Sequence, residues 1–201
     1  NTLRLAEVLH PTTGRYYYWI DDGLPMCRCP ECIGLSDSEQ ALLLEIELLK
    51  TLRTKDPRAN LAHLCYHNTL HAPVQVKPVP GIFLEFAPIA RKFDQPLSQR
   101  DIKSHTEFLD TLDANLAVFG RDTAQALEYW LDVSRFSGWK RETLTKIPWH
   151  NDVFVDDLLT YSRRGIRHVT TFACWLDGAY IERFGEPPLI EYGKGFDSVR
   201  G

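Results

Sequence analysis

Residues 16–23 read Tyr-Tyr-Tyr-Trp-Ile-Asp-Asp-Gly, an aromatic run that ends in two acids and a glycine. Aromatic side chains favour strands, so we predict a strand over Arg15–Ile20 that runs out into Asp21 and Asp22. The next residues bring three cysteines close together, in Cys27-Arg28-Cys29-Pro30-Glu31-Cys32. Two carboxylates and a thiol-rich loop thus follow one strand, which indicates a functional site at its end.

Apolar runs of strand length alternate with longer helical patterns along the rest of the chain. Ser36 and Glu39 form an N-cap signature before one of these helices. Further strands are predicted over Leu61–Tyr66, Ile82–Phe86, Ala126–Val133 and His168–Trp175. Helices are predicted over Asn1–His10, Gln40–Arg53, His105–Phe119, Asn151–Arg164 and, as the last element, Tyr180–Phe184.

This alternation predicts a single α/β domain over residues 1–201, with about five parallel strands and right-handed crossovers. A doubly wound sheet and part of a (β/α)₈ barrel both fit. Polar and aromatic residues follow the strands, and the Gly-x-Gly-x-x-Gly fingerprint of dinucleotide-binding folds is missing from the sequence, so we favour the barrel. A whole barrel needs about 250 residues. The chain therefore corresponds to roughly strands 4 to 8 of a partial TIM-type barrel.

The composition and charge of the chain argue against some classes of binding partner. A formal net charge of −4, with scattered basic residues, argues against nucleic acid. No apolar run is long enough to span a bilayer and no signal peptide is visible, so we expect no membrane association. Cys65 and Cys174 lie in apolar segments, which favours a reducing, cytoplasmic compartment. Because five open-edged strands expose pairing groups, we expect a homodimer or a missing N-terminal barrel half.

Alternation along two strands predicts which acids face the barrel interior. Over 82–86 the apolar set suits the helix layer and leaves Glu85 inward. Over 126–133 the same reasoning leaves Glu128, Trp130 and Asp132 inward. Inward acids would bind sugar hydroxyls or stabilise charge; alternatively, Glu85 and Glu128 pair with arginines inside the barrel, because a buried charge is costly without a partner.

Asp21 and Asp22 are the sharpest catalytic candidates. Adjacent carboxylates perturb each other, so that one can act as the acid that glycoside cleavage needs while a second stabilises positive charge on the sugar. The alternative is a solvated Asp-Asp-Gly turn. A sugar site also needs flat apolar rings. Trp149, Trp175 and Tyr66 are predicted to bind substrate, whereas Trp19 and Trp130 are expected in the core.

The cysteines have three interpretations. Cys27, Cys29 and Cys32 have a spacing that suits three positions of a structural zinc ion, with His67, His71 or Cys65 as the fourth ligand. They could instead form a disulfide in an exported protein, or remain reduced in a tight loop. No base beside a thiol marks a catalytic cysteine.

The run from Asp22 to Leu52, with its Cys-x-Cys-x-x-Cys motif, resembles an uncharacterised bacterial domain family grouped with glycoside hydrolases. The resemblance continues through Leu61–Tyr66, Glu128-Tyr129-Trp130 and Phe172-Ala173-Cys174-Trp175. It implies the C-terminal half of a hexosaminidase/α-glucuronidase-like barrel and a carbohydrate-active enzyme or a relic of one. By the same resemblance, Asp21 would orient an acetamido group and Asp22 would be the general acid.

The sequence therefore predicts a glycoside hydrolase-like protein that needs no cofactor beyond a possible structural zinc ion. Asp22 would be the acid, Asp21 or Glu85 would stabilise charge, and Glu128 and Asp132 would bind hydroxyls. The alternatives are a non-catalytic carbohydrate-binding domain and a structural half-barrel.

Overall fold

The structure is a computed structural model that describes residues 2–9 and 11–199. Within these residues the strands are β1 (Arg15–Tyr16), β2 (Asn60–Cys65), β3 (Ile82–Phe86), β4 (Gln125–Glu128) and β5 (His168–Thr171). The α-helices are α1 (Thr2–Leu9), α2 (Asp37–Arg53), α3 (Lys103–Phe119), α4 (Val133–Phe136), α5 (Asn151–Arg163), α6 (Gly178–Phe184) and α7 (Leu189–Ser198). Two short 3₁₀ helices are η1 (His67–Thr69) and η2 (Arg141–Thr143).

The predicted α/β class is confirmed, with five parallel strands that alternate with helices. The strands are ordered in the sheet as they occur in the chain, β1-β2-β3-β4-β5. Over the residues described, this order contains no reversal of the kind that creates the switch point of a doubly wound sheet. In the same part of the chain, no helix is long and apolar enough to cross a membrane.

Several predicted boundaries are wrong. Only Arg15 and Tyr16 of the first predicted strand are paired, β4 ends at Glu128, and β5 ends at Thr171. Tyr180–Phe184 is not the last helix, because α7 follows it. The predicted N-terminal helix is present as α1, while its proposed ends at positions 1 and 10 lie outside the described residues.

The contacts divide the chain into two compact units. The first contains the chain up to Ala87 and Thr111–Gln125; the second contains Pro88–Asp110 and the chain from Ala126 onward. Each unit has its own buried cluster of apolar residues.

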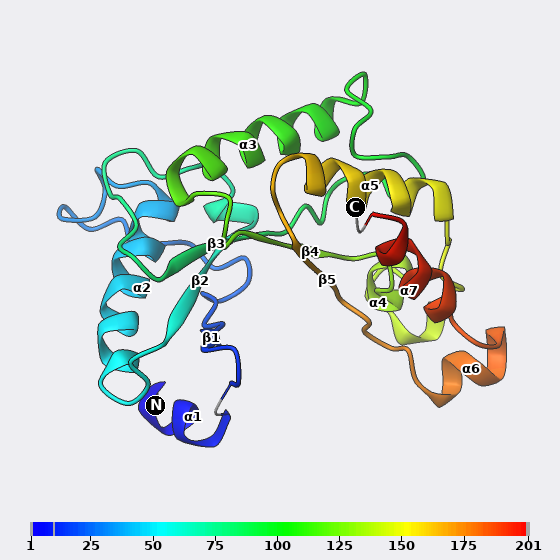
Figure 1. The fold of residues 1–201 in the computed structure, drawn as a ribbon, viewed down its shortest axis with the longest axis horizontal. Helices are drawn as coiled ribbons and strands as arrows, with labels where there is room; N and C mark the ends of the chain where they lie inside the picture. The colour runs from blue at the N-terminus through cyan, green and yellow to red at the C-terminus, as the bar shows by residue number, and fades with distance from the viewer. Residues whose placement is uncertain (1, 10, 200–201) are drawn as a thin grey trace. The chain divides into compact units, whose positions relative to one another are not determined.

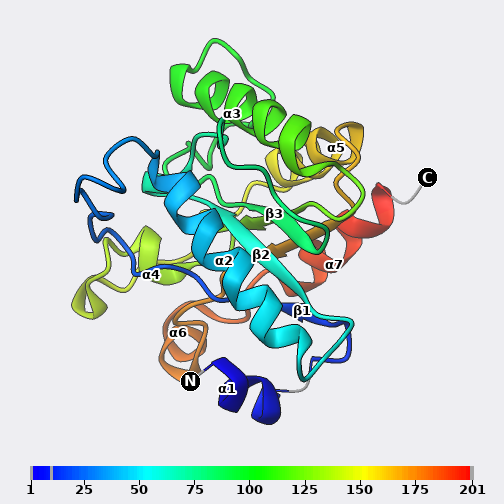
Figure 2. The same ribbon diagram turned by 90° about the vertical axis from the view of Figure 1, so that its left-hand side faces the viewer.

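In the first unit, α2 covers β2 and β3 (Figures 1 and 2). The predicted cap begins α2: the Ser36 side chain accepts a hydrogen bond from the Glu39 backbone, and the Glu39 carboxylate accepts one from the Ser36 backbone at 2.8 Å. Leu42, Leu49 and Leu52 of the helix pack with Leu61 and Ile82 in one buried cluster. This packing places Ile82 of β3 against a helix, as predicted.

In the second unit, α5 packs against α7 (Figure 1). The ring of Phe154 stacks on Tyr192 with centroids 5.3 Å apart. A Cβ atom at Gly195 would lie 2.2 Å from the Phe154 ring, so the glycine is needed for this close approach.

Candidate functional site

Glu85 is the centre of a polar group in the first unit. It is the fourth residue of β3 and only 2% exposed. Its carboxylate accepts hydrogen bonds from Trp19 Nε1 at 2.8 Å and from Gln125 Nε2 at 2.6 Å. The acid is therefore held from two sides by neutral donors.

The orientation of the Gln125 amide is fixed by its oxygen. Gln125 Oε1 accepts from Arg15 Nη1 and from the Tyr17 hydroxyl, each at 3.0 Å. With its oxygen engaged, the amide presents its N–H group to Glu85. Arg15 thus acts on the acid through Gln125, and its guanidinium also lies 4.5 Å from the centre of the Phe83 ring.

Two exposed aromatic rings adjoin Glu85. Trp19 is 43% and Tyr17 is 44% exposed, and their ring centroids lie 6.5 Å apart in an edge arrangement. Tyr17 also contacts Phe83 edge-on at 5.8 Å. The expectation that Trp19 lies in the core is wrong, because its ring is partly in solvent while its N–H group reaches the buried acid.

Burial raises the pKa of Glu85 to about 7, against the opposing hydrogen bonds from Trp19 and Gln125 and the charge of Arg15. At neutral pH a carboxyl with this pKa is divided between its acid and its carboxylate forms. Burial and the nearby Glu85 also raise the pKa of Tyr17. The group can therefore exchange a proton near pH 7 beside apolar rings.

Asp21 and Asp22 are both exposed in the loop after β1. The structure brings Asp22 to Tyr66, which directly follows β2. Burial, together with the charge of Asp22 and a hydrogen bond to it, raises the pKa of Tyr66 to about 12. Two of the predicted residues are thus neighbours, and Tyr66 also packs edge-on against His67 at 4.2 Å.

Cys27, Cys29 and Cys32 converge as their spacing predicts. Their sulfur atoms all lie within 4.8 Å of one another, and the cluster can bind a metal ion. The predicted fourth ligands are not part of this group in the described chain. Cys65 is fully buried, donates to the Leu70 carbonyl at 3.1 Å and lies outside this cluster. Mutual hydrogen bonds shift the pKa values of two of these thiols in opposite directions. The pKa of Cys29 is lowered, chiefly by its hydrogen bond with Cys27. The pKa of Cys32 is raised to about 11, chiefly by its hydrogen bond with Cys29.

Glu128, in the second unit, is fully buried and accepts a hydrogen bond from the hydroxyl of Tyr161 on α5. Arg91 Nε lies 3.3 Å from its carboxylate. The prediction that Glu128 lies on the side of β4 away from the helices is therefore wrong. Glu128 does have an arginine partner, but on the helix side of the strand and not in the interior, where the alternative interpretation placed the pair.

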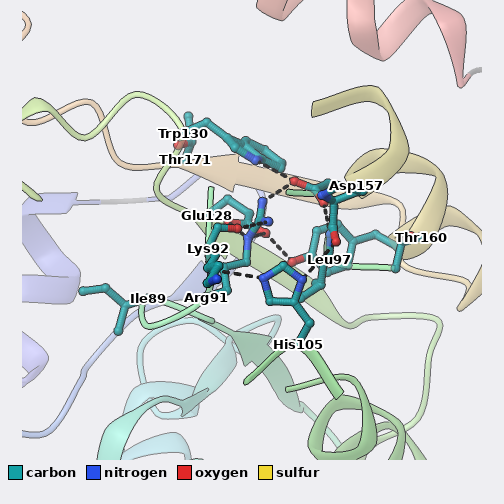
Figure 3. Close-up of polar contacts among 12 residues, drawn as sticks. Ile89, Arg91, Lys92, Leu97, His105, Glu128, Trp130, Asp157, Thr160 and Thr171 are labelled. Atoms are coloured by element: carbon teal, nitrogen blue, oxygen red, sulfur yellow. Dashed lines mark hydrogen bonds and ion pairs between the residues drawn. The ribbon is translucent and has the colours of Figure 1, made fainter. Parts of the chain in front are cut away.

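Arg91 joins Glu128 to a second buried acid, Asp157 of α5 (Figure 3). Asp157 also accepts from Leu97 N at 2.7 Å and from Trp130 Nε1 at 3.0 Å. Burial raises the pKa of both acids, that of Glu128 to about 7, against the opposing charge of Arg91. For Arg91, burial alone would lower its pKa, but the two carboxylates outweigh burial and raise it. Every charge here has a partner inside the protein, which is the arrangement of a structural network.

His105 supports the loop that carries Arg91. Its Nε2 atom accepts from the backbone N–H of Lys92 at 3.1 Å, so the proton resides on Nδ1, which donates to the Pro96 carbonyl at 3.0 Å. Burial lowers the pKa of His105 and favours this neutral form.

The other predicted ligand-binding residues of the second unit have packing or capping contacts. Asp132 is buried and caps α4 by accepting from Arg135 N at 3.2 Å, so its expected place within a strand is wrong. Trp149 and Trp175 both pack against the second apolar cluster. Trp175 has a positive φ of 64°, and Arg141 lies 5.3 Å from its ring centre.

Sequence reasoning missed Trp19 and Gln125, which bond to Glu85, and Arg15 and Tyr17, which bond to Gln125. The alternation within residues 15–19 was the available signal, because every second side chain of this run reaches the Glu85 group. Gln125 gave no such signal, since it is 110 residues from Arg15 in sequence.

Comparisons of the chain with protein-family models, with curated proteins and with solved structures gave no match.

Proposed function

We propose that this chain binds a carbohydrate on the rings of Tyr17 and Trp19, and that Glu85 is the acid of a glycoside hydrolase-type reaction. One observation carries the proposal: a carboxyl with a pKa of about 7 is held by neutral donors beside two exposed aromatic rings. Aromatic rings are suitable partners for the C–H faces of sugars. A carboxyl that is partly protonated at neutral pH can protonate a leaving glycosidic oxygen.

The reaction requires a second carboxylate, which activates water or attacks the sugar. Asp22 is our candidate and Asp21 is its neighbour; both are exposed and follow the same aromatic run as Trp19. This assignment gives Glu85 the acid role in place of Asp22. Tyr66, adjacent to Asp22, is then a candidate to contact the substrate.

The finer fold assignment belongs to the same proposal. Parallel strands ordered as in the chain are typical of the winding of a (β/α)₈ barrel, and barrel enzymes place their sites at the carboxyl ends of strands. Glu85 is next to the last residue of β3, and Asp22 and Tyr66 follow β1 and β2.

A second candidate function is carbohydrate binding without catalysis. The 2% exposure of Glu85 favours it, because an acid enclosed by protein can hold Trp19 and Gln125 in place without contacting a substrate. Both candidates predict sugar binding, and only the first predicts turnover.

The test is a panel of chromogenic glycosides, including N-acetylhexosaminides and glucuronides, measured with wild type, Glu85→Gln and Trp19→Ala. If Glu85 is the acid, Glu85→Gln lowers kcat by about 10²- to 10⁴-fold and leaves sugar binding in place. The wild-type kcat falls as the pH rises through about 7, because the acid must be protonated. Trp19→Ala weakens binding.

Glu142→Gln is the control, since Glu142 is an exposed acid of the other unit. Sugar binding without turnover would replace catalysis by the binding function. Absence of both binding and turnover across the panel, with a folded protein, would overturn the proposal.

A further inference from the structure

Three thiols meet in the loop before α2. The backbone turns tightly here, because the N–H groups of Cys32 and Ile33 both donate to the Cys29 carbonyl, at 3.0 and 2.9 Å. This turn brings the sulfur atoms of Cys27, Cys29 and Cys32 within 4.8 Å of one another. All three are free thiols, and Cys27 is exposed while the other two are half-buried.

The number and spacing of the sulfur atoms favour a metal ion over a disulfide. A disulfide joins only two thiols and would leave the third unused beside it. Tetrahedral zinc with Zn–S bonds of about 2.3 Å separates its sulfur ligands by about 3.8 Å. The thiols thus need to move inward by only a small amount to reach that geometry.

The loop is also attached to α2 by polar contacts that do not use sulfur. Gln40 Nε2 donates to the carbonyls of Cys27 and Cys32, at 3.1 and 3.3 Å. Arg28 pairs with Asp37 of α2 at 2.6 Å. The backbone that presents the thiols is therefore held in place before any ion binds.

We propose that Cys27, Cys29 and Cys32 bind one Zn²⁺ ion as thiolates, with a water molecule from solvent in the fourth position. The fourth position is assigned to water because, within the described residues, the group contains no fourth His, Cys, Asp or Glu ligand atom. Binding releases the thiol protons that remain, so affinity for zinc falls as the pH is lowered. The bound ion stabilises the loop of residues 27–32 against the start of α2. This site does not depend on the proposed sugar chemistry.

The test measures metal content and metal spectra of the purified full chain, with Cys29→Ser as the variant and Cys174→Ser as the matched control. Cys174 is a half-buried thiol of the other unit and is not in the cluster. We expect about one zinc ion per chain for wild type and for Cys174→Ser. Cys29→Ser should weaken zinc affinity by more than about 100-fold. Loss of a residue that only hydrogen-bonds to a metal ligand weakens affinity by about 10- to 100-fold, so a larger loss indicates a direct ligand. Cobalt in place of zinc should give a thiolate-to-metal charge-transfer band that Cys29→Ser lacks.

Circular dichroism separates loss of a ligand from loss of the fold, and a Cys27→Ser variant replaces Cys29→Ser if the latter does not fold. Mass spectrometry after thiol alkylation provides a second measurement: zinc should protect all three cysteines, and a chelator should expose them. The proposal is wrong if wild type binds no zinc at micromolar free metal, if Cys29→Ser binds it as well as wild type does, or if two of the three cysteines are isolated as a disulfide.

Discussion

Glu85 and Glu128 are two buried strand glutamates with the same shift in pKa and opposite surroundings. They are 2% and 0% exposed, and burial raises the pKa of each to about 7. Glu128 lies against Arg91 and the hydroxyl of Tyr161, inside a network that includes a second acid. Glu85 has neutral donors and lies next to exposed rings. A raised pKa therefore does not identify a site by itself; the hydrogen-bond and ion-pair partners, and the exposure of the neighbouring rings, distinguish a structural charge from a reactive group.

The Glu128 network should show the largest response, to Arg91→Met. The substitution keeps an apolar chain of similar length and removes the guanidinium group that pairs with both Glu128 and Asp157. Two buried acids then lose the cation that pairs with both of them, so we expect the free energy of unfolding at pH 7 to fall by about 3 to 5 kcal/mol. Urea denaturation followed by circular dichroism measures it.

Arg100→Met is the matched control, because Arg100 pairs with Asp110 at 2.7 Å on the surface. An exposed pair contributes only about 0 to 1 kcal/mol. If both substitutions destabilise the protein equally, the view of the Glu128 network as the structural member of the comparison fails.

Glu85 should make the free energy of unfolding depend on pH. Its pKa is raised from the usual 4.5 to about 7 in the folded protein, so the folded state prefers the protonated acid. The preference contributes about 3 kcal/mol to the free energy of unfolding. This stabilisation is fully present below pH 4.5 and is lost as the pH rises through about 7. The free energy of unfolding of wild type, minus that of Glu85→Gln, should therefore fall by about that amount between pH 4 and pH 8.

Taking the difference removes the pH dependence of Glu128, which both proteins share. Glu142→Gln tests whether replacing any glutamate has this effect, and its difference from wild type should change by less than about 1 kcal/mol. A flat difference for Glu85→Gln over the same range would mean that the acid is solvated in the native state.

Some of the structural features in this comparison could be predicted from the sequence. The apolar set of β3 predicted that Ile82 faces the helices and Glu85 the other side, and the Ser36–Glu39 cap predicted the start of α2. The thiols also converge as predicted, since three cysteines within six residues need only one tight turn to meet. These features depend on neighbours in sequence, or on a face that is apolar throughout.

The direction of Glu128 was wrong for a physical reason. A charged residue in a strand was expected to avoid the helix layer, but Tyr161 and Arg91 supply its partners from 33 and 37 residues away in sequence. Such partners cannot be inferred from alternation. The helix α7 was missed for a similar reason. Two glycines weaken its helical pattern in the sequence. One of them, Gly195, is needed for the close approach to Phe154, which exists only after folding.

The smallest effects come from a matched pair of tryptophan substitutions, which sharpen the comparison most. Trp130 Nε1 donates to Asp157 at 3.0 Å, and Trp19 Nε1 donates to Glu85 at 2.8 Å. Replacing either residue by Phe removes the same N–H group. Trp130 is 4% exposed, so Trp130→Phe leaves a cavity and a buried acid short of a donor, and should lower the free energy of unfolding by about 2 to 3 kcal/mol.

Trp19 is 43% exposed, so water can replace part of the lost contact and Trp19→Phe should lower the same quantity by only about 1 kcal/mol. It should have a second effect. The Trp19 hydrogen bond holds the pKa of Glu85 down, so the pH at which the Glu85 contribution is lost should move upward in Trp19→Phe. Carboxyl ¹³C shifts in a pH titration measure that move directly. If Trp19→Phe proves as destabilising as Trp130→Phe and leaves the Glu85 titration unchanged, Trp19 is a packing residue, and the contrast between an acid beside exposed rings and an acid inside a charged network is lost.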